Sequence, residues 1–234
     1  AQIGAECDRA IVMVVDGAQV AAVLNGRDGL LETMTAGTVM VCSTIALAEL
    51  RAIAERAAAR GVTVIDSPVS GGVTGAEAGT LTLLCGGEPA AFEAQRPLLQ
   101  AMGSQVVHMG PLGAGLVSKL ANNLIIGVGR LAIGEAFAMA RQAGVAPDHL
   151  YRTLRTCTAD SWILRGLEAA IVRGEHPPAT FLGLKDLTCA VESGRAVLQA
   201  MPVTSLAREL YQLIDARIGP LRGSNEVLRF YLEP

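Results

Sequence analysis

Aromatic residues are scarce in this chain, at 3% of 234 residues, although hydrophobic residues make up 51%. A core built from Ala, Val, Leu and Ile suits close helix packing and buried parallel strands better than an aromatic β-sandwich. The charged fraction is only 18%, so we expect a sizeable core and little disorder.

Paired cysteines, clustered histidines and clustered basic residues are also lacking. The five cysteines lie far apart with no CxxC pair, which is typical of reduced thiols that fill the core of a cytosolic protein. The three histidines lack metal-ligand spacing, so we expect no metal site. The formal net charge is -3 and the basic residues are scattered, so we expect no nucleic-acid partner.

A long uninterrupted apolar run is absent. The most apolar stretch, residues 116–140, contains five residues that are costly in lipid: Lys119, Asn122, Asn123, Arg130 and Glu135. It therefore predicts a buried helix of a soluble protein and no membrane partner. Glu6 and Asp8 precede only a very short apolar run, which is unlike a signal peptide, so we expect a cytoplasmic protein.

Short apolar runs alternate with helical patterns in the first half of the chain. The runs lie at residues 10–15, 38–42, 62–65, 80–85 and 106–108. This alternation predicts an α/β domain with a parallel sheet covered on both faces, in which Ser43 or Thr44 caps a helix. After Gly110 only helical periodicity remains, beginning with a long helix at about residues 115–142. We therefore predict two domains, residues 1–110 and an all-helical domain at residues 111–234.

A glycine-rich connection follows the third apolar run. Ser70-Gly71-Gly72 comes soon after the end of that strand, on the side where open α/β sheets bind ligands. Ser70 offers a hydroxyl, and the two glycines let backbone N–H groups approach an anion such as a carboxylate. The alternative is a tight turn that requires positive φ, which alone would account for both glycines.

Gly115, Lys119, Asn123 and Gly127 are spaced by four and line one stripe of the predicted long helix. The glycines would let a ligand lie against the helix while Lys119 and Asn123 point at it. A partly apolar cleft lowers the pKa of a lysine, so Lys119 could take up a hydroxyl proton as hydride leaves the same carbon. The alternative is a lysine that reaches solvent beside a buried asparagine.

Lys185-Asp186-Leu187 opens a later apolar helix. On its own it indicates no more than an acidic residue at a helix start beside a surface lysine. Trp162, the only tryptophan, is compatible with the core and with a pocket wall.

These segments, in this order, resemble the 3-hydroxyisobutyrate and tartronate-semialdehyde family of β-hydroxyacid dehydrogenases. The substrate-binding signature of that family is similar to residues 66–87, DSPVSGGVTGAEAGTLTLLCGG. Its catalytic helix is similar to residues 110–127, GPLGAGLVSKLANNLIIG, and its later lysine motif to LKDL at residues 184–187. CSTI at residues 42–45 is similar to the segment along the nicotinamide, and the resemblance runs from about Asp8 to about Tyr211.

The resemblance implies a Rossmann-type domain followed by an all-α substrate and dimerisation domain that is entered by the long helix. It implies that Ser70, Gly71 and Gly72 hold the substrate carboxylate. Lys119 would be the general acid/base, and Asn123 would hydrogen-bond the reacting substrate.

The resemblance also implies NAD or NADP as cofactor, with Ser43, Thr44 and Lys185 as the residues that contact it. Lys185 would close over the substrate and the nicotinamide, while Asp186 would be structural. Asn122 stands where the related 6-phosphogluconate dehydrogenases have a histidine, which favours a small hydroxyacid over a sugar phosphate. The presence of Lys119 distinguishes the chain from imine reductases of the same superfamily.

The sequence departs from the family pattern in three places. Residues 177–184 look a few residues shorter, which disturbs the expected pocket wall, and Met40-Val41-Cys42 lacks an acidic residue that often precedes the Ser-Thr pair. The opening strand, GxGxxG turn, helix and second strand of the family, roughly fifty residues, do not occur in this sequence. The resemblance therefore implies that the strand at residues 10–15 is the fourth of the complete domain, with a free sheet edge and weakened cofactor binding.

We therefore expect an oxidoreductase that transfers hydride between NAD(P) and a small 3-hydroxyacid or its semialdehyde, as a homodimer or homotetramer. Candidate substrates include 3-hydroxyisobutyrate, glycerate and serine, with 4-hydroxybutyrate as an outlier. The alternative is a truncated, non-catalytic paralogue that acts as an oligomerising or binding scaffold.

Overall fold

A computed structural model of the protein describes residues 1–176, 183–219 and 226–232. The chain forms two compact units. Unit 1 comprises Ala1–Asn122 with Cys189–Ala200, and unit 2 comprises Asn123–Thr188 with Met201–Pro234. Two helices contribute to both units: α7 (Ala114–Gln142) and α11 (Gly183–Ala196).

Unit 1 contains the sheet. Its strands are β1 (Arg9–Val12), β2 (Gly37–Val41), β3 (Val62–Asp66), β4 (Val69–Ser70), β5 (Thr82–Gly86) and β6 (Gln105–Gly110). The strand order is β1-β2-β3-β5-β4, and β6 also pairs with β5. β1, β2 and β3 are parallel, as predicted; β2 and β3 are mostly buried, whereas β1 is largely exposed. The expected fold class, an α/β domain followed by helices, is confirmed.

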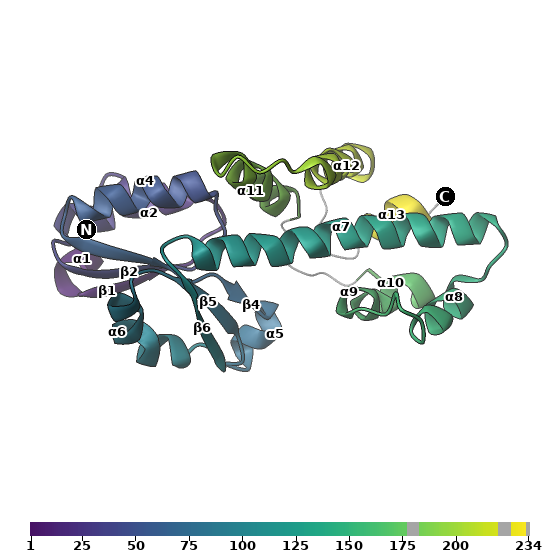
Figure 1. Cartoon of the computed structure of the whole chain (residues 1–234), viewed down its shortest axis with the longest axis horizontal. Helices are drawn as coiled ribbons and strands as arrows, with labels where there is room; N and C mark the ends of the chain where they lie inside the picture. Colours follow the sequence, from purple (N-terminus) through teal and green to yellow (C-terminus); the bar gives the residue numbers. More distant parts are fainter. Residues whose placement is uncertain (177–182, 220–225, 233–234) are drawn as a thin grey trace. The chain divides into compact units, whose positions relative to one another are not determined.

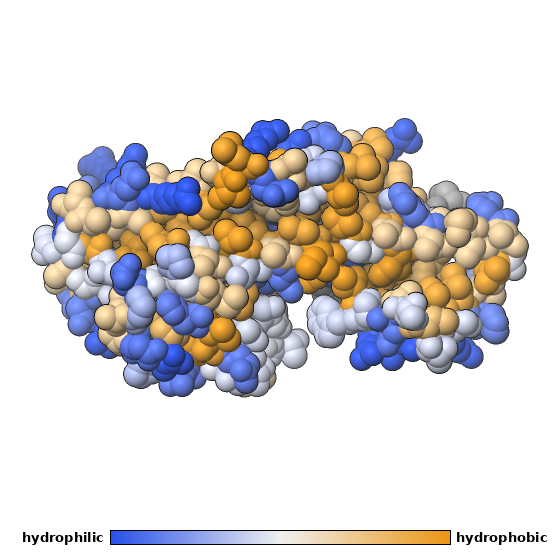
Figure 2. All heavy atoms as spheres, in the orientation of Figure 1, coloured by the Kyte–Doolittle hydropathy of each residue, from blue (hydrophilic) through white to orange (hydrophobic). Residues whose placement is uncertain are grey.

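Helices cover the two faces of the sheet in unit 1 (Figure 1). The helices of unit 1 that precede α7 are α1 (Gln2–Glu6), α2 (Gly17–Asn25), α3 (Leu30–Thr33), α4 (Leu47–Ala58), α5 (Gly72–Glu77) and α6 (Pro89–Gln100). α2 and α4 lie on one face and α6 on the other. α4 buries Leu47, Leu50 and Ile53, which are spaced as one helical face requires, and hydrophilic residues cover its outer side (Figure 2).

The start of α4 differs from the prediction. Neither Ser43 nor Thr44 caps this helix; the N-cap position is Ala46. The backbone N–H of Ala46 donates to Glu49 Oε2 at 2.8 Å, and that of Leu47 donates to Ser193 Oγ of α11 at 3.0 Å. Because alanine has no side-chain acceptor, the first turn obtains its hydrogen bonds from a later residue and from a distant helix.

The connection after β3 also differs from a simple glycine-rich loop. It contains the two-residue strand β4 and the short helix α5. β5 therefore returns antiparallel to β3 and β4, and parallel pairing resumes between β5 and β6.

β1 lies at one end of the sheet and, among the described residues, pairs only with β2. Alternate residues along this end are exposed: Ile11 by 40%, Met13 by 60% and Val15 by 49%. In the described residues this segment therefore presents a row of exposed apolar side chains.

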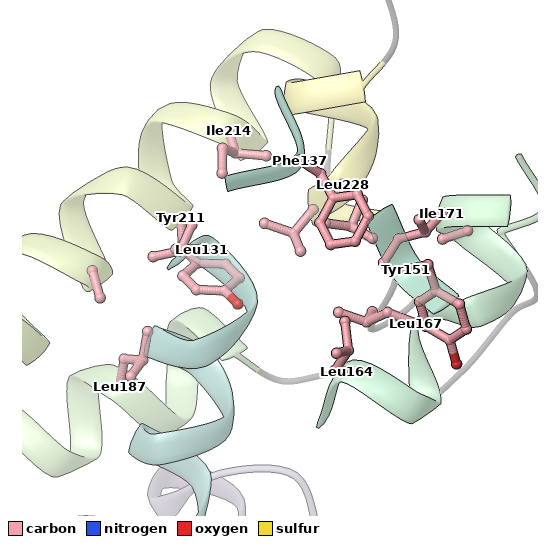
Figure 3. Close-up of a cluster of buried hydrophobic side chains, with 13 residues drawn as sticks. Leu131, Phe137, Tyr151, Leu164, Leu167, Ile171, Leu187, Tyr211, Ile214 and Leu228 are labelled. Atoms are coloured by element: carbon pink, nitrogen blue, oxygen red, sulfur yellow. The ribbon is translucent and has the colours of Figure 1, made fainter. Parts of the chain in front are cut away.

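Unit 2 is helical in its described residues. Besides its parts of α7 and α11 it contains α8 (Pro147–Leu154), α9 (Trp162–Gly166), α10 (Glu168–Arg173), α12 (Pro202–Ile218) and α13 (Val227–Leu232). Its core joins side chains from these helices, with Leu131 beside Tyr211 and Phe137 beside Leu228 (Figure 3). The Tyr211 hydroxyl donates to the carbonyl of Gly127 at 3.1 Å, so the one polar atom of this buried ring is satisfied.

The long helix is less buried than predicted. α7 is the one helix of the described ranges that is long and apolar enough to cross a membrane by length and composition, and 22% of its most apolar window is buried. Ile125 and Met139 are 60% and 72% exposed. The prediction of a buried helix was therefore wrong for much of α7, because apolar residues occur around its whole circumference. Core helices of soluble proteins can have the same composition, so composition alone assigns no membrane span.

Candidate functional site

The Ser70-Gly71-Gly72 segment lies where β4 ends and α5 begins. Ser70 is half-buried and pairs with Thr82 of β5, whereas Gly71 and Gly72 are exposed. Gly71 has φ of +133° and Gly72 of +63°, so the backbone itself requires both glycines. A Cβ at Gly72 would meet nothing within 4 Å, which leaves room for a ligand beside the backbone. The structure therefore supports the turn interpretation and remains compatible with the carboxylate site.

Ser43 and Thr44 follow the carboxyl end of β2. Ser43 is buried, and its Oγ accepts a hydrogen bond from the backbone N–H of Val14 at 2.8 Å. Thr44 is half-buried. The Ser43 hydroxyl thus holds the segment after β1, and its proton can still be donated to another group.

Two buried cysteines lie near the same ends of the strands. The Cys42 Sγ is 3.3 Å from Ser67 Oγ, and burial raises the pKa of Cys42. Burial also raises the pKa of Cys85 to about 12, so this thiol stays protonated at neutral pH. These two thiols and that of Cys189 are buried as predicted, whereas Cys7 and Cys157 are exposed, contrary to that prediction.

Asp66, the last residue of β3, holds the first turn of α7. Its carboxylate is 1% exposed, and it accepts hydrogen bonds from Gly113 N at 2.7 Å and from Leu116 N at 2.6 Å. Burial raises the pKa of Asp66, while hydrogen bonds from these backbone amides and that of Gly115 act to lower it. The sequence interpretation gave Asp66 no role. A carboxylate that ends an otherwise apolar strand was the available signal, because a buried charge requires partners.

Lys119 is half-buried in the second turn of α7, in unit 1. The glycines of its stripe serve packing and do not admit a ligand. A Cβ at Gly115 would lie 2.1 Å from the Leu84 carbonyl oxygen, and a Cβ at Gly127 would lie 3.2 Å from Leu187. The idea that a ligand lies against these two glycines was therefore wrong, because β5 and α11 already occupy the space.

Asn123, Asp186 and Lys185 meet in unit 2. Asn123 Nδ2 donates to Asp186 Oδ2 at 2.8 Å, and Lys185 Nζ lies 2.9 Å from Asp186 Oδ1. Asp186 Oδ1 has no well-directed hydrogen bond, so its contact with Lys185 Nζ is an ion pair. Because an ionised carboxylate only accepts, Asp186 must face the amide nitrogen of Asn123, and this turns the Asn123 oxygen away from it.

Lysine occurs at only two positions in the chain, Lys119 and Lys185; the other basic residues are arginines and three histidines. An ammonium group differs from a guanidinium because its pKa can be shifted enough for proton transfer, whereas arginine stays charged. The two positions singled out in the sequence are thus the only ones with a side-chain ammonium group.

The structure joins Asn123 and Lys185 through Asp186, whose connecting role the sequence did not reveal. The disturbed segment before Lys185 lies largely outside the described residues, because residues 177–182 are not described. Trp162 is 75% exposed and so is no part of the core. Among the described residues, no group of three or more His, Cys, Asp or Glu side chains could hold a metal ion.

Two family profiles match this chain. The NAD binding domain of 6-phosphogluconate dehydrogenase matches residues 1–110, and the NAD-binding domain of NADP-dependent 3-hydroxyisobutyrate dehydrogenase matches residues 113–231. The second match alone covers about half of the sequence and includes Lys119, Asn123 and Lys185.

Individual proteins are similar over most of the chain. A 3-hydroxyisobutyrate dehydrogenase of Pseudomonas aeruginosa is 36% identical over 213 residues, covering 87% of this chain and 72% of the relative. An NAD-dependent L-serine dehydrogenase of the same organism is 39% identical over 197 residues, covering 80% and 66%. The solved structure of a Mycobacterium tuberculosis 3-hydroxyisobutyrate dehydrogenase with L-serine has a TM-score of 0.84 at 28% identity, covering 98% of this chain and 81% of that one.

Proposed function

Because this chain belongs to the 3-hydroxyisobutyrate dehydrogenase family, we propose that it transfers hydride between NAD(P) and C3 of a small 3-hydroxyacid or its semialdehyde. The observation that carries the proposal is the position of its two lysines. Lys119 and Lys185 stand where the motifs of the family require an acid/base and a cofactor-proximal ammonium. The family assignment does not favour the non-catalytic scaffold considered above.

Proton transfer is assigned to Lys119. In the oxidative direction the hydroxyl proton of the substrate passes to the neutral Nζ of Lys119 while hydride leaves C3, so the alcohol becomes an aldehyde. In the reductive direction the ammonium returns that proton to the carbonyl oxygen. Asn123 would hydrogen-bond the reacting oxygen of the substrate, and Asp186 holds the Asn123 amide in one orientation.

The residues present fit a nicotinamide cofactor, which supplies the hydride acceptor when bound. Ser43 and Thr44 follow the carboxyl end of β2, the edge where parallel α/β sheets bind their ligands. Lys185, held by Asp186, would supply positive charge near the cofactor and the substrate.

Replacing Lys185 with methionine should raise the KM for the cofactor, because the positive charge near it is lost. An unchanged KM for the cofactor would refute this role.

Substrate binding is assigned to the Ser70 segment. Ser70 Oγ and the N–H groups of Gly71 and Gly72 would hold the substrate carboxylate, since first-turn amides of α5 lack acceptors within their helix.

Ser70→Ala is expected to raise the substrate KM about tenfold, because a hydrogen bond to a charged group contributes about 1.5–3 kcal/mol. Steady-state kinetics of Thr74→Ala, an exposed neighbour in α5, provide the control. Equal KM values for the two variants would exclude Ser70 from the carboxylate site.

The oligomer is assigned to the exposed apolar residues of unit 2. They lie on α7 and α12: Ile125, Met139, Val203, Leu206 and Leu213. Large exposed apolar patches mark interaction surfaces, and a second copy of the chain offers the same surface. We expect a homodimer or homotetramer with a cytoplasmic location. Light scattering in solution tests the assembly, and a monomer at every concentration would contradict it.

A further inference from the structure

The buried carboxylate of Asp66 supplies the cap of α7 from a strand. α7 begins at Ala114, so Gly113 directly precedes the helix and Leu116 is its third residue. Amides at these positions have no acceptor within their own helix. A helix usually obtains such an acceptor from the residue just before it, but here the acceptor lies 47 and 50 residues earlier in the chain.

The surrounding backbone is shaped to admit this carboxylate. A Cβ at Gly86 would lie 2.4 Å from Asp66 Oδ1, and a Cβ at Gly115 would lie 2.9 Å from Oδ2. Any side chain at either position would therefore move the carboxylate or the helix. A negative charge is also favourable beside the partial positive charge at the N-terminus of a 29-residue helix.

The backbone that carries Asp66 is itself fixed on the sheet. Ser67 N donates to the carbonyl of Val41 at 2.8 Å, and the carbonyl of Pro68 accepts from Leu84 N at 3.0 Å. Two residues beyond Pro68, Ser70 pairs with Thr82. On the helix side, Lys119 follows Leu116 by three residues, which is less than one turn.

From this geometry we propose that Asp66 is a positioning residue for the reaction: its carboxylate sets the register of Lys119 relative to the sheet segment that continues to Ser70. The proposal rests on the proposed function of Lys119. Asp66 itself contacts neither the substrate nor the cofactor. It acts because one side chain joins the backbone that carries Ser70 to the helical turn that precedes Lys119.

The test compares Asp66→Asn with Leu99→Ala. Asparagine keeps the size of the side chain but turns one acceptor into a donor that faces an amide N–H. Leu99 is fully buried in the unit 1 core, and α6, which carries it, contains none of the assigned residues, so Leu99→Ala is a control for lost stability. Asp66→Asn should lower kcat about 10- to 100-fold with little change in the cofactor KM, because small misplacements of reacting groups slow the chemistry strongly.

A second measurement follows the reactivity of the Lys119 side chain directly. Because the chain has two lysines, acetylation of each by acetic anhydride can be followed by peptide mass spectrometry as a function of pH. Asp66→Asn should change the pH dependence for Lys119 and leave that for Lys185 unaltered. Leu99→Ala should change neither, although it lowers the thermal stability.

Several outcomes would overturn the proposal. One is a kcat for Asp66→Asn equal to that for Leu99→Ala, and another is an unaltered acetylation profile of Lys119. If Asp66→Asn does not fold, hydrogen exchange of the Leu116 amide in the unmodified protein decides: slow exchange is expected from its bond to Asp66, and rapid exchange would overturn the proposal. Failure of the proposed function is distinguishable, because Lys119→Met would then remain active whatever the effect of Asp66→Asn.

Discussion

Replacing Lys119 with methionine is expected to lower kcat about 10²- to 10⁴-fold, the range that a positioned general acid/base contributes. Methionine retains an unbranched apolar side chain in this half-buried position of α7 but has no group that exchanges a proton. The fold should therefore persist while proton transfer is lost. The measurement is kcat for oxidation of the 3-hydroxyacid, followed by the absorbance of reduced cofactor.

A matched control lies next to Lys119. The Ser118 hydroxyl donates to the carbonyl of Ala114 within the same helix at 2.8 Å, so Ser118→Ala removes a local bond without touching the proposed chemistry. Its kcat should stay close to that of the unmodified protein. Turnover of Lys119→Met within tenfold of the unmodified protein would show that another group carries the proton.

Replacing Asp186 with asparagine is expected to lower kcat/KM about 10- to 100-fold. Asp186 is 14% exposed, and its charge holds both the Asn123 amide and the Lys185 ammonium. The amide that replaces it loses the ion pair and weakens the bond to Asn123. A hydrogen bond to a charged group contributes about 1.5–3 kcal/mol, and about 1.4 kcal/mol corresponds to a factor of ten in rate.

Glu192 provides the control for this change, since it is an exposed carboxylate of the same helix, α11. Glu192→Gln removes a carboxylate charge in the same way, but from an exposed surface. Screening by water there makes the effect of the lost charge on stability small. If Asp186→Asn and Glu192→Gln have the same kcat/KM, the Asn123–Asp186–Lys185 cluster does not contribute to the reaction.

Five of the six strands could be predicted from sequence because each one has a short apolar run, whereas the two-residue strand β4 has none and was missed. α7 was predicted almost to the residue, since its helical pattern continues without interruption from Ala114 to Gln142. What could not be predicted were bonds between distant segments. The cap of α4 by Ser193 and that of α7 by Asp66 depend on tertiary packing, which no local pattern encodes.

The site shows the same division. The family motif identified Lys119 and Lys185, and the chemistry of lysine explains why those positions were informative. The stripe of glycines was misinterpreted because small residues suit a ligand and a close protein contact equally well, and only the packing of Leu84 and Leu187 decides between them. The role of Asp186 depends on a side chain 63 positions away, so it could only be found in the structure.

Direct hydride transfer from C3 of a 3-hydroxyacid can be followed with a deuterium label. The protein would be incubated with NAD or NADP and with L-serine or 3-hydroxyisobutyrate that carries deuterium at C3, and the cofactor would be analysed by mass spectrometry. We expect one deuterium on the nicotinamide ring of the reduced cofactor and none derived from the solvent. Reduced cofactor without deuterium, or no reduction with any small 3-hydroxyacid, would contradict it.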